Sequence, residues 1–165
     1  MTETGSAEGD LDERLRIEGT STRSIPWDGI AAQYEQALVC ERVGFECASG
    51  DWLERAYVGV SAFEILTDAD LPAETTHFRL EAVDGIAACT PLDAVEHALL
   101  ALADRPGETT AGIDPATVTV DGPYPRFVSP DIVGPRAIKQ LAVIEPLSLD
   151  AGEEPNDYES LPKRE

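Results

Sequence analysis

The chain has 165 residues, enough for one ordinary domain, and 42% of them are apolar, which suffices for a core. Its 32 acidic and 12 basic residues give a net charge of -20. Neutralising phosphates takes clustered cations, so this composition excludes general nucleic-acid binding and argues against docking on anionic membranes. No apolar run approaches the roughly 20 residues of a membrane span. The acidic N-terminus carries no secretory signal, which predicts a cytoplasmic protein.

The acidic charge has two interpretations. It could be an acidic tail on a normal domain, or an adaptation of the whole chain to molar salt. The acids are spread along the sequence and only two of the 12 basic residues are Lys, which favours the halophilic interpretation. At about 1 M salt the Debye length is about 3 Å, so self-repulsion is screened and the acidic surface serves solubility.

Three parts follow from the composition along the chain. Residues 1–13 are predicted to be a disordered acidic N-terminus, residues 14–149 form the domain, and residues 150–165 form a loose acidic tail. A first short strand is expected around Leu15 and Ile17, and a short helix over residues 27–34. A strand is expected over residues 37–48, with a possible break at Gly44.

The middle of the chain carries the clearest local signals. A short strand is expected at residues 56–58, and Ser61 and Glu64 form a capping box that predicts a short helix. Alternating residues predict a strand over 76–83, and an Asp-Gly turn leads to a second strand over 86–89. Thr90 is then expected to be the N-cap of a helix with Pro91 at its first position and an apolar stripe that reaches Leu102.

The last part of the domain is rich in Gly, Pro and Thr before it becomes apolar again. Possible strands are expected over residues 117–120 and 126–128, and a turn followed by a strand over 137–149. Many short strands with a few short helices predict an α+β fold and not a doubly wound sheet, because the strands do not alternate regularly with helices.

The cysteines and histidines do not form a metal site by spacing. Three Cys in a chain without a signal peptide indicate reduced thiols. Cys40 and Cys47 are seven residues apart, which in a straight strand means opposite faces and about 23 Å. His77 and His97 pair with no Cys at zinc-finger spacing, so both are expected to be surface or capping residues.

Two segments together form a specific sequence signature. In the first, Tyr57 and Gly59 follow Cys47 by ten and twelve residues, and a short helix ending at Leu66 comes next. The second is a run of basic, apolar, Pro and Gly residues at fixed spacing: Arg126, Val128, Pro130, Gly134, Arg136, Lys139, Leu141 and Ile144. In this order the segments resemble the sulfite-oxidase-type molybdopterin-binding domain. The resemblance covers about residues 15–149.

The resemblance implies both a fold and a chemistry. It implies the sulfite-oxidase-type α+β fold and a molybdenum–molybdopterin cofactor, with Cys47 as the metal ligand and catalytic residue. A thiolate is a soft ligand that suits such a metal. Arg136, Lys139 and Arg126 would bind the cofactor, since guanidinium groups suit phosphate contacts. The implied function is two-electron oxygen-atom transfer at molybdenum, with a small-molecule substrate or a redox partner.

Departures from the family pattern leave alternatives open. No match to the family's N-terminal cofactor segment precedes residue 36, and Gln140 replaces an aromatic residue. Cys47 could instead be a buried structural thiol, as expected for Cys40 and Cys89. Arg136 and Lys139 could simply pair with surface acids. The alternative function is therefore a cofactor-free, non-catalytic binding or structural module that keeps the same fold.

Overall fold

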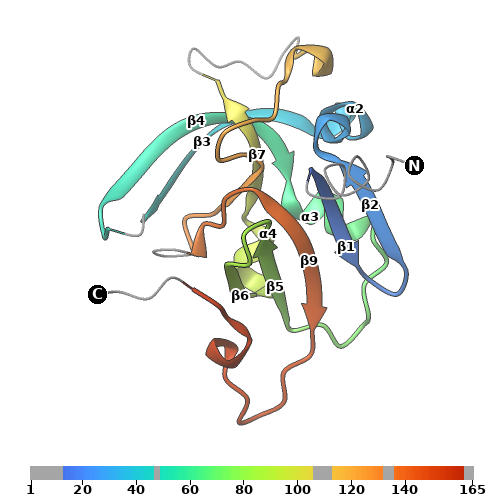
Figure 1. Cartoon of the computed structure of the whole chain (residues 1–165), viewed down its shortest axis with the longest axis vertical. Coiled ribbons are helices and arrows are strands. Elements are labelled where there is room, and N and C mark those ends of the chain that lie inside the picture. Colours follow the sequence, from blue (N-terminus) through green and yellow to red (C-terminus); the bar gives the residue numbers. More distant parts are fainter. Residues whose placement is uncertain (1–12, 47–48, 106–112, 132–135, 162–165) are drawn as a thin grey trace, which may run out of the picture.

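The computed structural model describes residues 13–46, 49–105, 113–131 and 136–161. These residues form two β-sheets, short helices and long connections (Figure 1). The predicted α+β class, with many short strands and few short helices, is confirmed. Buried residues of both sheets and of the helices join in one hydrophobic core.

The first sheet has five strands in the order β2-β1-β9-β5-β6. They are β2 (Thr22–Pro26), β1 (Arg14–Glu18), β9 (Leu141–Leu147), β5 (His77–Ala82) and β6 (Ala87–Pro91). β1 runs parallel to β9, and the other neighbours are antiparallel. The alternation predicted for β5 is confirmed, because Phe78, Leu80 and Ala82 are buried, and in β1 the alternate residues Leu15 and Ile17 are buried as well.

The second sheet has four antiparallel strands in the order β3-β4-β7-β8. They are β3 (Leu38–Glu46), β4 (Trp52–Ser61), β7 (Leu99–Asp104) and β8 (Arg126–Val128). β3 passes through Gly44 without the break that the sequence allowed. A side chain at Gly59 would collide with the Leu100 carbonyl oxygen, so β4 and β7 approach closely where their register shifts.

Short helices connect the strands. They are α2 (Ile30–Gln33), α3 (Ala62–Thr67) and α4 (Leu92–Glu96), with 3-10 turns η1 (Trp27–Gly29), η2 (Glu35–Ala37), η3 (Pro115–Thr117) and η5 (Pro155–Tyr158). The helix predicted after Ser61 is confirmed as α3, although the Ser61 hydroxyl makes no capping hydrogen bond within the described residues. The possible strand over residues 117–120 is absent: Thr117 is the last residue of η3, and residues 118–120 have no regular secondary structure.

The long helix predicted after Thr90 is wrong. α4 begins at Leu92, Pro91 is its N-cap residue, and Thr90 belongs to β6. The Thr90 side chain is 1% exposed and its hydroxyl has no hydrogen-bond partner within the described residues. The apolar run from Leu99 to Leu102 forms β7, buried on both faces, and not a helical stripe.

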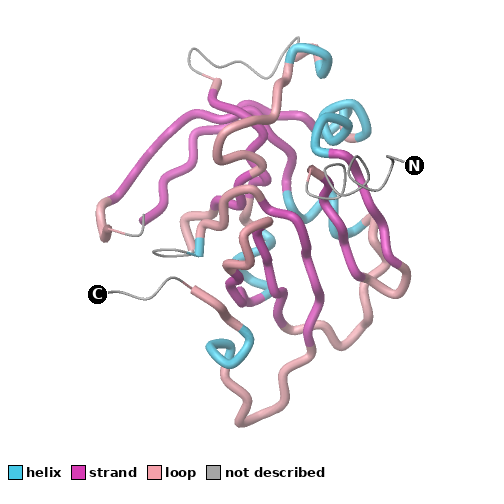
Figure 2. The backbone as a smooth tube through the Cα atoms, in the orientation of Figure 1, coloured by secondary structure: helices cyan, strands magenta, loops and turns pink. Residues whose placement is uncertain are grey.

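Residues 150–161, named here the C-terminal segment, return to β6 at their end. The Ala87 N–H donates to the Ser160 carbonyl at 2.8 Å, and the Ser160 N–H donates back to the Ala87 carbonyl at 2.9 Å. Figure 2 shows a loop leaving β9 and leading into η5 before the chain returns to β6. The part of the predicted loose tail that the structure describes is therefore in contact with the domain.

Candidate functional site

Arg136, a predicted cofactor-binding residue, is bound by the carboxylate of Glu159. The Arg136 Nε donates to Glu159 Oε2 at 2.8 Å, and its terminal nitrogen donates to Oε1 at 2.7 Å. Two parallel charge-assisted hydrogen bonds of this kind are the geometry with which Arg holds carboxylates and phosphates. Side-chain exposure is 30% for Arg136 and only 5% for Glu159, so the carboxylate is desolvated.

A third donor reaches the same carboxylate from β6. The backbone N–H of Cys89 donates to Glu159 Oε2 at 2.8 Å. One residue earlier, the Tyr158 carbonyl accepts a hydrogen bond from Arg79 Nε at 3.0 Å. Arg136, Cys89 and Arg79 thus form a donor cluster that binds the C-terminal segment. In chemical terms it is a site for an oxyanion, and the Glu159 carboxylate is the anion in it.

The Cys89 thiol lies within electrostatic reach of this contact. Arg79 and Cys89 are paired directly across β5 and β6. The Cys89 side chain is 3% exposed. Burial, and then the Glu159 carboxylate, raise the pKa of the thiol to about 11. The covered thiol is therefore neutral at physiological pH and a poor nucleophile, which agrees with the structural role expected for it.

Arg126, the second predicted cofactor residue, lies on the four-stranded sheet. Its guanidinium carbon is 4.9 Å from the centre of the Phe45 ring, a cation–π distance. Its Nε donates to the Ala137 carbonyl at 3.2 Å. Because Ala137 follows Arg136 in the chain, this bond places Arg126 beside the backbone stretch that carries Arg136.

A buried tyrosine lies near Arg126. Tyr57 is 1% exposed, and its hydroxyl has no hydrogen-bond partner within the described residues. Burial raises the pKa of Tyr57, while the nearby charge of Arg126 partly opposes that shift. Its ring packs edge-on against Tyr124 with centroids 6.1 Å apart. Tyr57 is thus a core residue with one unsatisfied polar atom.

Lys139, the third predicted cofactor residue, takes no part in the described contacts of Arg136 and Arg126. Lys139 is exposed and forms no ion pair with a described residue. Cys47, the predicted metal ligand, lies outside the described residues. Among the residues that the structure describes, no group of three or more His, Cys, Asp or Glu side chains could hold a metal ion.

The two histidines lie apart, as predicted. His77 Nδ1 is 2.9 Å from the Thr76 hydroxyl. His97 Nδ1 is 3.1 Å from Asp131 Oδ2, and both side chains are more than half exposed. The His97–Asp131 pair lies at an open hollow of about 690 Å³ that Ser61 also lines. No described hydrogen bond joins Ser61 to His97, so the hollow holds no nucleophile–base pair.

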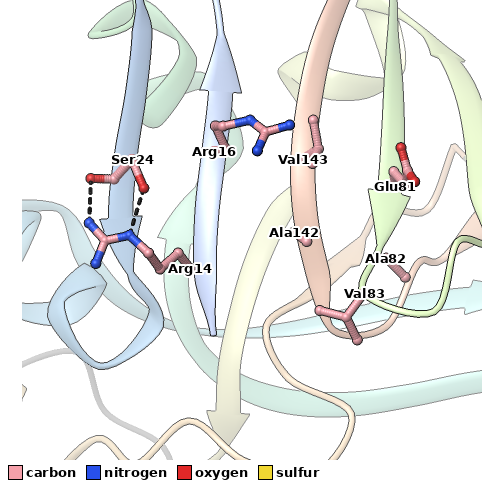
Figure 3. A pocket seen from close by; sticks show the side chains of 8 residues that line it. All are labelled: Arg14, Arg16, Ser24, Glu81, Ala82, Val83, Ala142 and Val143. Atoms are coloured by element: carbon pink, nitrogen blue, oxygen red, sulfur yellow. Dashed lines mark hydrogen bonds between the residues drawn. The ribbon is translucent and has the colours of Figure 1, made fainter. Parts of the chain in front are cut away.

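A smaller hollow of about 220 Å³ lies over β1, β9 and β5 (Figure 3). Arg14 and Arg16 line it, but each has a local acceptor. Arg14 Nε donates to the Ser24 hydroxyl at 2.7 Å, and Arg16 Nε donates to Glu18 at 2.8 Å. Both arginines stand on an exposed sheet face, so this hollow lacks the buried, convergent donors of the Arg136 cluster.

Comparison with known proteins identifies the fold. The structure is similar to a chain of the sulfane dehydrogenase SoxCD from Paracoccus pantotrophus, with a TM-score of 0.63 and 18% sequence identity. The match covers 85% of this chain and 39% of that chain, so this chain spans about two-fifths of the neighbour's length. The likeness confirms the predicted fold class. No family model and no curated protein matches the sequence.

The sequence analysis did not predict Glu159, which is the residue that completes the anion site. Residues 150–165 were expected to form a loose acidic tail, in which no single acid stood out. One available signal was the run Ala87-Ala88-Cys89, which is apolar at every position and therefore needs cover on both faces.

No helix of the described part is long and apolar enough to cross a membrane.

Proposed function

We propose that this chain is a molybdopterin-dependent oxidoreductase domain with a small-molecule substrate or redox partner. The observation that carries the proposal is the oxyanion geometry at Arg136, in a fold similar to that of a dehydrogenase. When bound, the cofactor supplies two-electron oxygen-atom transfer at molybdenum. The cytoplasmic location predicted from the sequence belongs to this proposal.

The donor set fits the phosphate end of such a cofactor. The Arg136 guanidinium and the Cys89 N–H converge on one oxyanion, and a phosphate accepts the same bidentate bonds as a carboxylate. Exposed Lys139, three residues further on, adds a second cation. Arg126, held by the Ala137 carbonyl and the Phe45 ring, adds a third cation beside the same backbone stretch.

The proposal assigns the metal to Cys47, which follows the end of β3 in the sequence. A thiolate is the ligand type that such a metal prefers, and a hydroxyl is a poor substitute at neutral pH. Cys89 is unsuited to this role, because its side chain is buried and burial raises its thiol pKa to about 11.

Metal content tests the proposal. The protein is purified in molar KCl from a host that makes the cofactor, and molybdenum per chain is measured by mass spectrometry. We expect wild-type protein to carry molybdenum and Cys47→Ser to lose it. Cys40→Ser and Cys89→Ser are the matched controls and should keep it. Folded wild-type protein without molybdenum would contradict the proposal, as would retention in Cys47→Ser.

One observation favours the alternative, a cofactor-free binding or structural module. The charge of Arg136 is already neutralised by a carboxylate of the same chain. On this alternative the Arg136–Glu159 pair only fastens the C-terminal segment. Both wild-type protein and Glu159→Gln would then be folded and free of molybdenum after expression in the cofactor-producing host.

A further inference from the structure

The C-terminal segment is held to the domain mainly by polar contacts. Apart from Glu159, these are the paired backbone bonds between Ala87 and Ser160 and the bond from Arg79 to the Tyr158 carbonyl. No residue from 150 to 160 belongs to the buried core, and only the partly buried Leu161 packs against it. Segments with few buried apolar contacts open locally at a low free-energy cost.

The charge of the segment makes Glu159 its electrostatic anchor. Residues 150–161 contain five acids and no basic residue, in a chain of net charge -20. Such a segment is repelled by most of the domain surface when salt is low. Its described ion pair with the domain is Arg136–Glu159, whereas Arg79 reaches only the Tyr158 carbonyl and is itself paired with Glu81. Loss of the Arg136 contact therefore removes the main electrostatic reason for the segment to stay.

We propose that the C-terminal segment is a displaceable internal ligand: Glu159 occupies an oxyanion site made by Arg136 and the Cys89 N–H, and a phosphate-bearing ligand competes with it. Phosphate binding to Arg136 and attachment of the C-terminal segment through Glu159 are mutually exclusive, because one guanidinium edge cannot hold both anions in bidentate geometry. The inference rests on the proposed function for the identity of the ligand that carries the phosphate.

The phosphate concentration needed to displace Glu159 from Arg136 can be estimated. A tethered group acts at an effective concentration on the order of millimolar, so free inorganic phosphate must reach millimolar levels or more to displace Glu159. A ligand that also reached Lys139 and Arg126 would need far less. Removal of the Glu159 charge should lower the phosphate concentration needed by about tenfold or more, the equivalent of one charge-assisted hydrogen bond.

Cys89 reports the position of the segment without any cofactor. Its thiol is 3% exposed and its backbone N–H binds Glu159, so we expect alkylation to become faster when the segment moves away. The test measures iodoacetamide labelling of Cys89 by peptide mass spectrometry in molar KCl, with inorganic phosphate titrated against chloride at equal ionic strength. We expect phosphate, and not chloride, to accelerate Cys89 labelling in the wild-type protein. Cys40, half-buried in β3, is the internal control for global unfolding.

Three variants sharpen the test. Glu159→Gln should label at Cys89 about ten to a hundred times faster than wild type without phosphate, the equivalent of a lost charged hydrogen bond. Glu154→Gln is the matched control, because it removes the same charge from an exposed position of the same segment. It should label like wild type. Arg136→Gln should label fast and show no response to phosphate.

Two results would overturn the inference. One is a Cys89 labelling rate that phosphate leaves at its chloride value in both wild-type protein and Glu159→Gln. The other is equal acceleration of Cys40, which would mean global unfolding. The wild-type titration decides even if a variant fails to fold. Displacement by phosphate in a protein that never acquires molybdenum would support this inference and reject the proposed function. A protein that acquires molybdenum but whose Cys89 labelling does not respond to phosphate would support the proposed function and reject this inference.

Discussion

The Arg16–Glu18 and Arg136–Glu159 pairs have nearly the same shortest distances, 2.8 and 2.7 Å, yet they differ in almost everything else. The first joins neighbours on one strand, with 48% and 36% of the two side chains exposed. The second joins distant parts of the chain, with 30% and 5% exposed. Exposed pairs contribute about 0–1 kcal/mol and are screened by salt. The distance between charges therefore does not measure their contribution here.

The two pairs also mark two ends of one sheet. Near β1 the outer face carries polar residues, Arg14, Arg16 and Ser24, which line an open hollow (Figure 3). At β6 the outer face carries buried Ala87 and Cys89, and the C-terminal segment bonds to the backbone of both. The Glu159 carboxylate is shielded from water where the C-terminal segment meets the domain, whereas both side chains of the Arg16–Glu18 pair remain exposed.

Salt withdrawal is the most severe way to test this comparison. Weaker screening strengthens the single Arg16–Glu18 attraction but strengthens the repulsion within a chain of net charge -20 far more. We expect the melting temperature to fall steeply as KCl is lowered from molar to millimolar levels. Calorimetry across that range checks it. A melting temperature that is flat across the range would remove the halophilic interpretation.

Removal of one acid from each pair should give the next largest effect. Glu159→Ala leaves the Arg136 guanidinium and the Cys89 N–H without their shared acceptor, so we expect a loss of about 2 kcal/mol in the free energy of unfolding. Glu18→Ala should cost less than about 0.5 kcal/mol. Denaturant unfolding of both variants in molar KCl measures the difference. Equal losses would break the comparison.

The covered thiol predicts a pH dependence. The pKa of Cys89 is about 11 in the folded state and near 9 in an ordinary thiol. Above pH 9 the unfolded chain releases a proton that the folded chain retains, so the free energy of unfolding falls as pH rises from 9 toward 11. The expected loss from this group is about 1 kcal/mol by pH 10. Denaturant unfolding of Cys89→Ala across the same pH range should lack this loss. A pH profile identical to that of the wild-type protein would contradict the assignment of the loss to Cys89.

The smallest expected effect concerns the inner face of the covered strand. The buried Thr90 hydroxyl has no hydrogen-bond partner within the described residues, so it lost hydration on folding without compensation. Thr90→Val keeps the shape and removes the hydroxyl, and we expect a gain of about 0.5–1 kcal/mol in unfolding free energy. Thr22→Val, on the exposed end of β2, is the control and should change little. A loss in Thr90→Val would show that the hydroxyl is satisfied.

Local patterns predicted most strands correctly, and the one large error has a clear physical cause. The sequence Thr90-Pro91-Leu92 does precede a helix, but α4 ends at Glu96. The apolar residues from Leu99 onward fit a helical stripe and equally a strand buried on both faces. Periodicity cannot separate the two, because the difference lies in what packs on each face. The neighbouring strands β4 and β8 make Leu99–Asp104 a central strand.

The sequence by itself determined the α+β class, the alternation of β1 and β5, and the positions of the Arg126 and Arg136 motifs. These depend on local backbone preference and on the spacing of apolar residues, which short stretches of chain encode. Only the tertiary structure decided that Glu159, and none of the other acids, is the partner of Arg136. That choice depends on β6 offering a free edge and a backbone N–H to a segment 70 residues further along the chain. An ion pair between such distant residues leaves no local trace, because its strength comes from the water that folding removes.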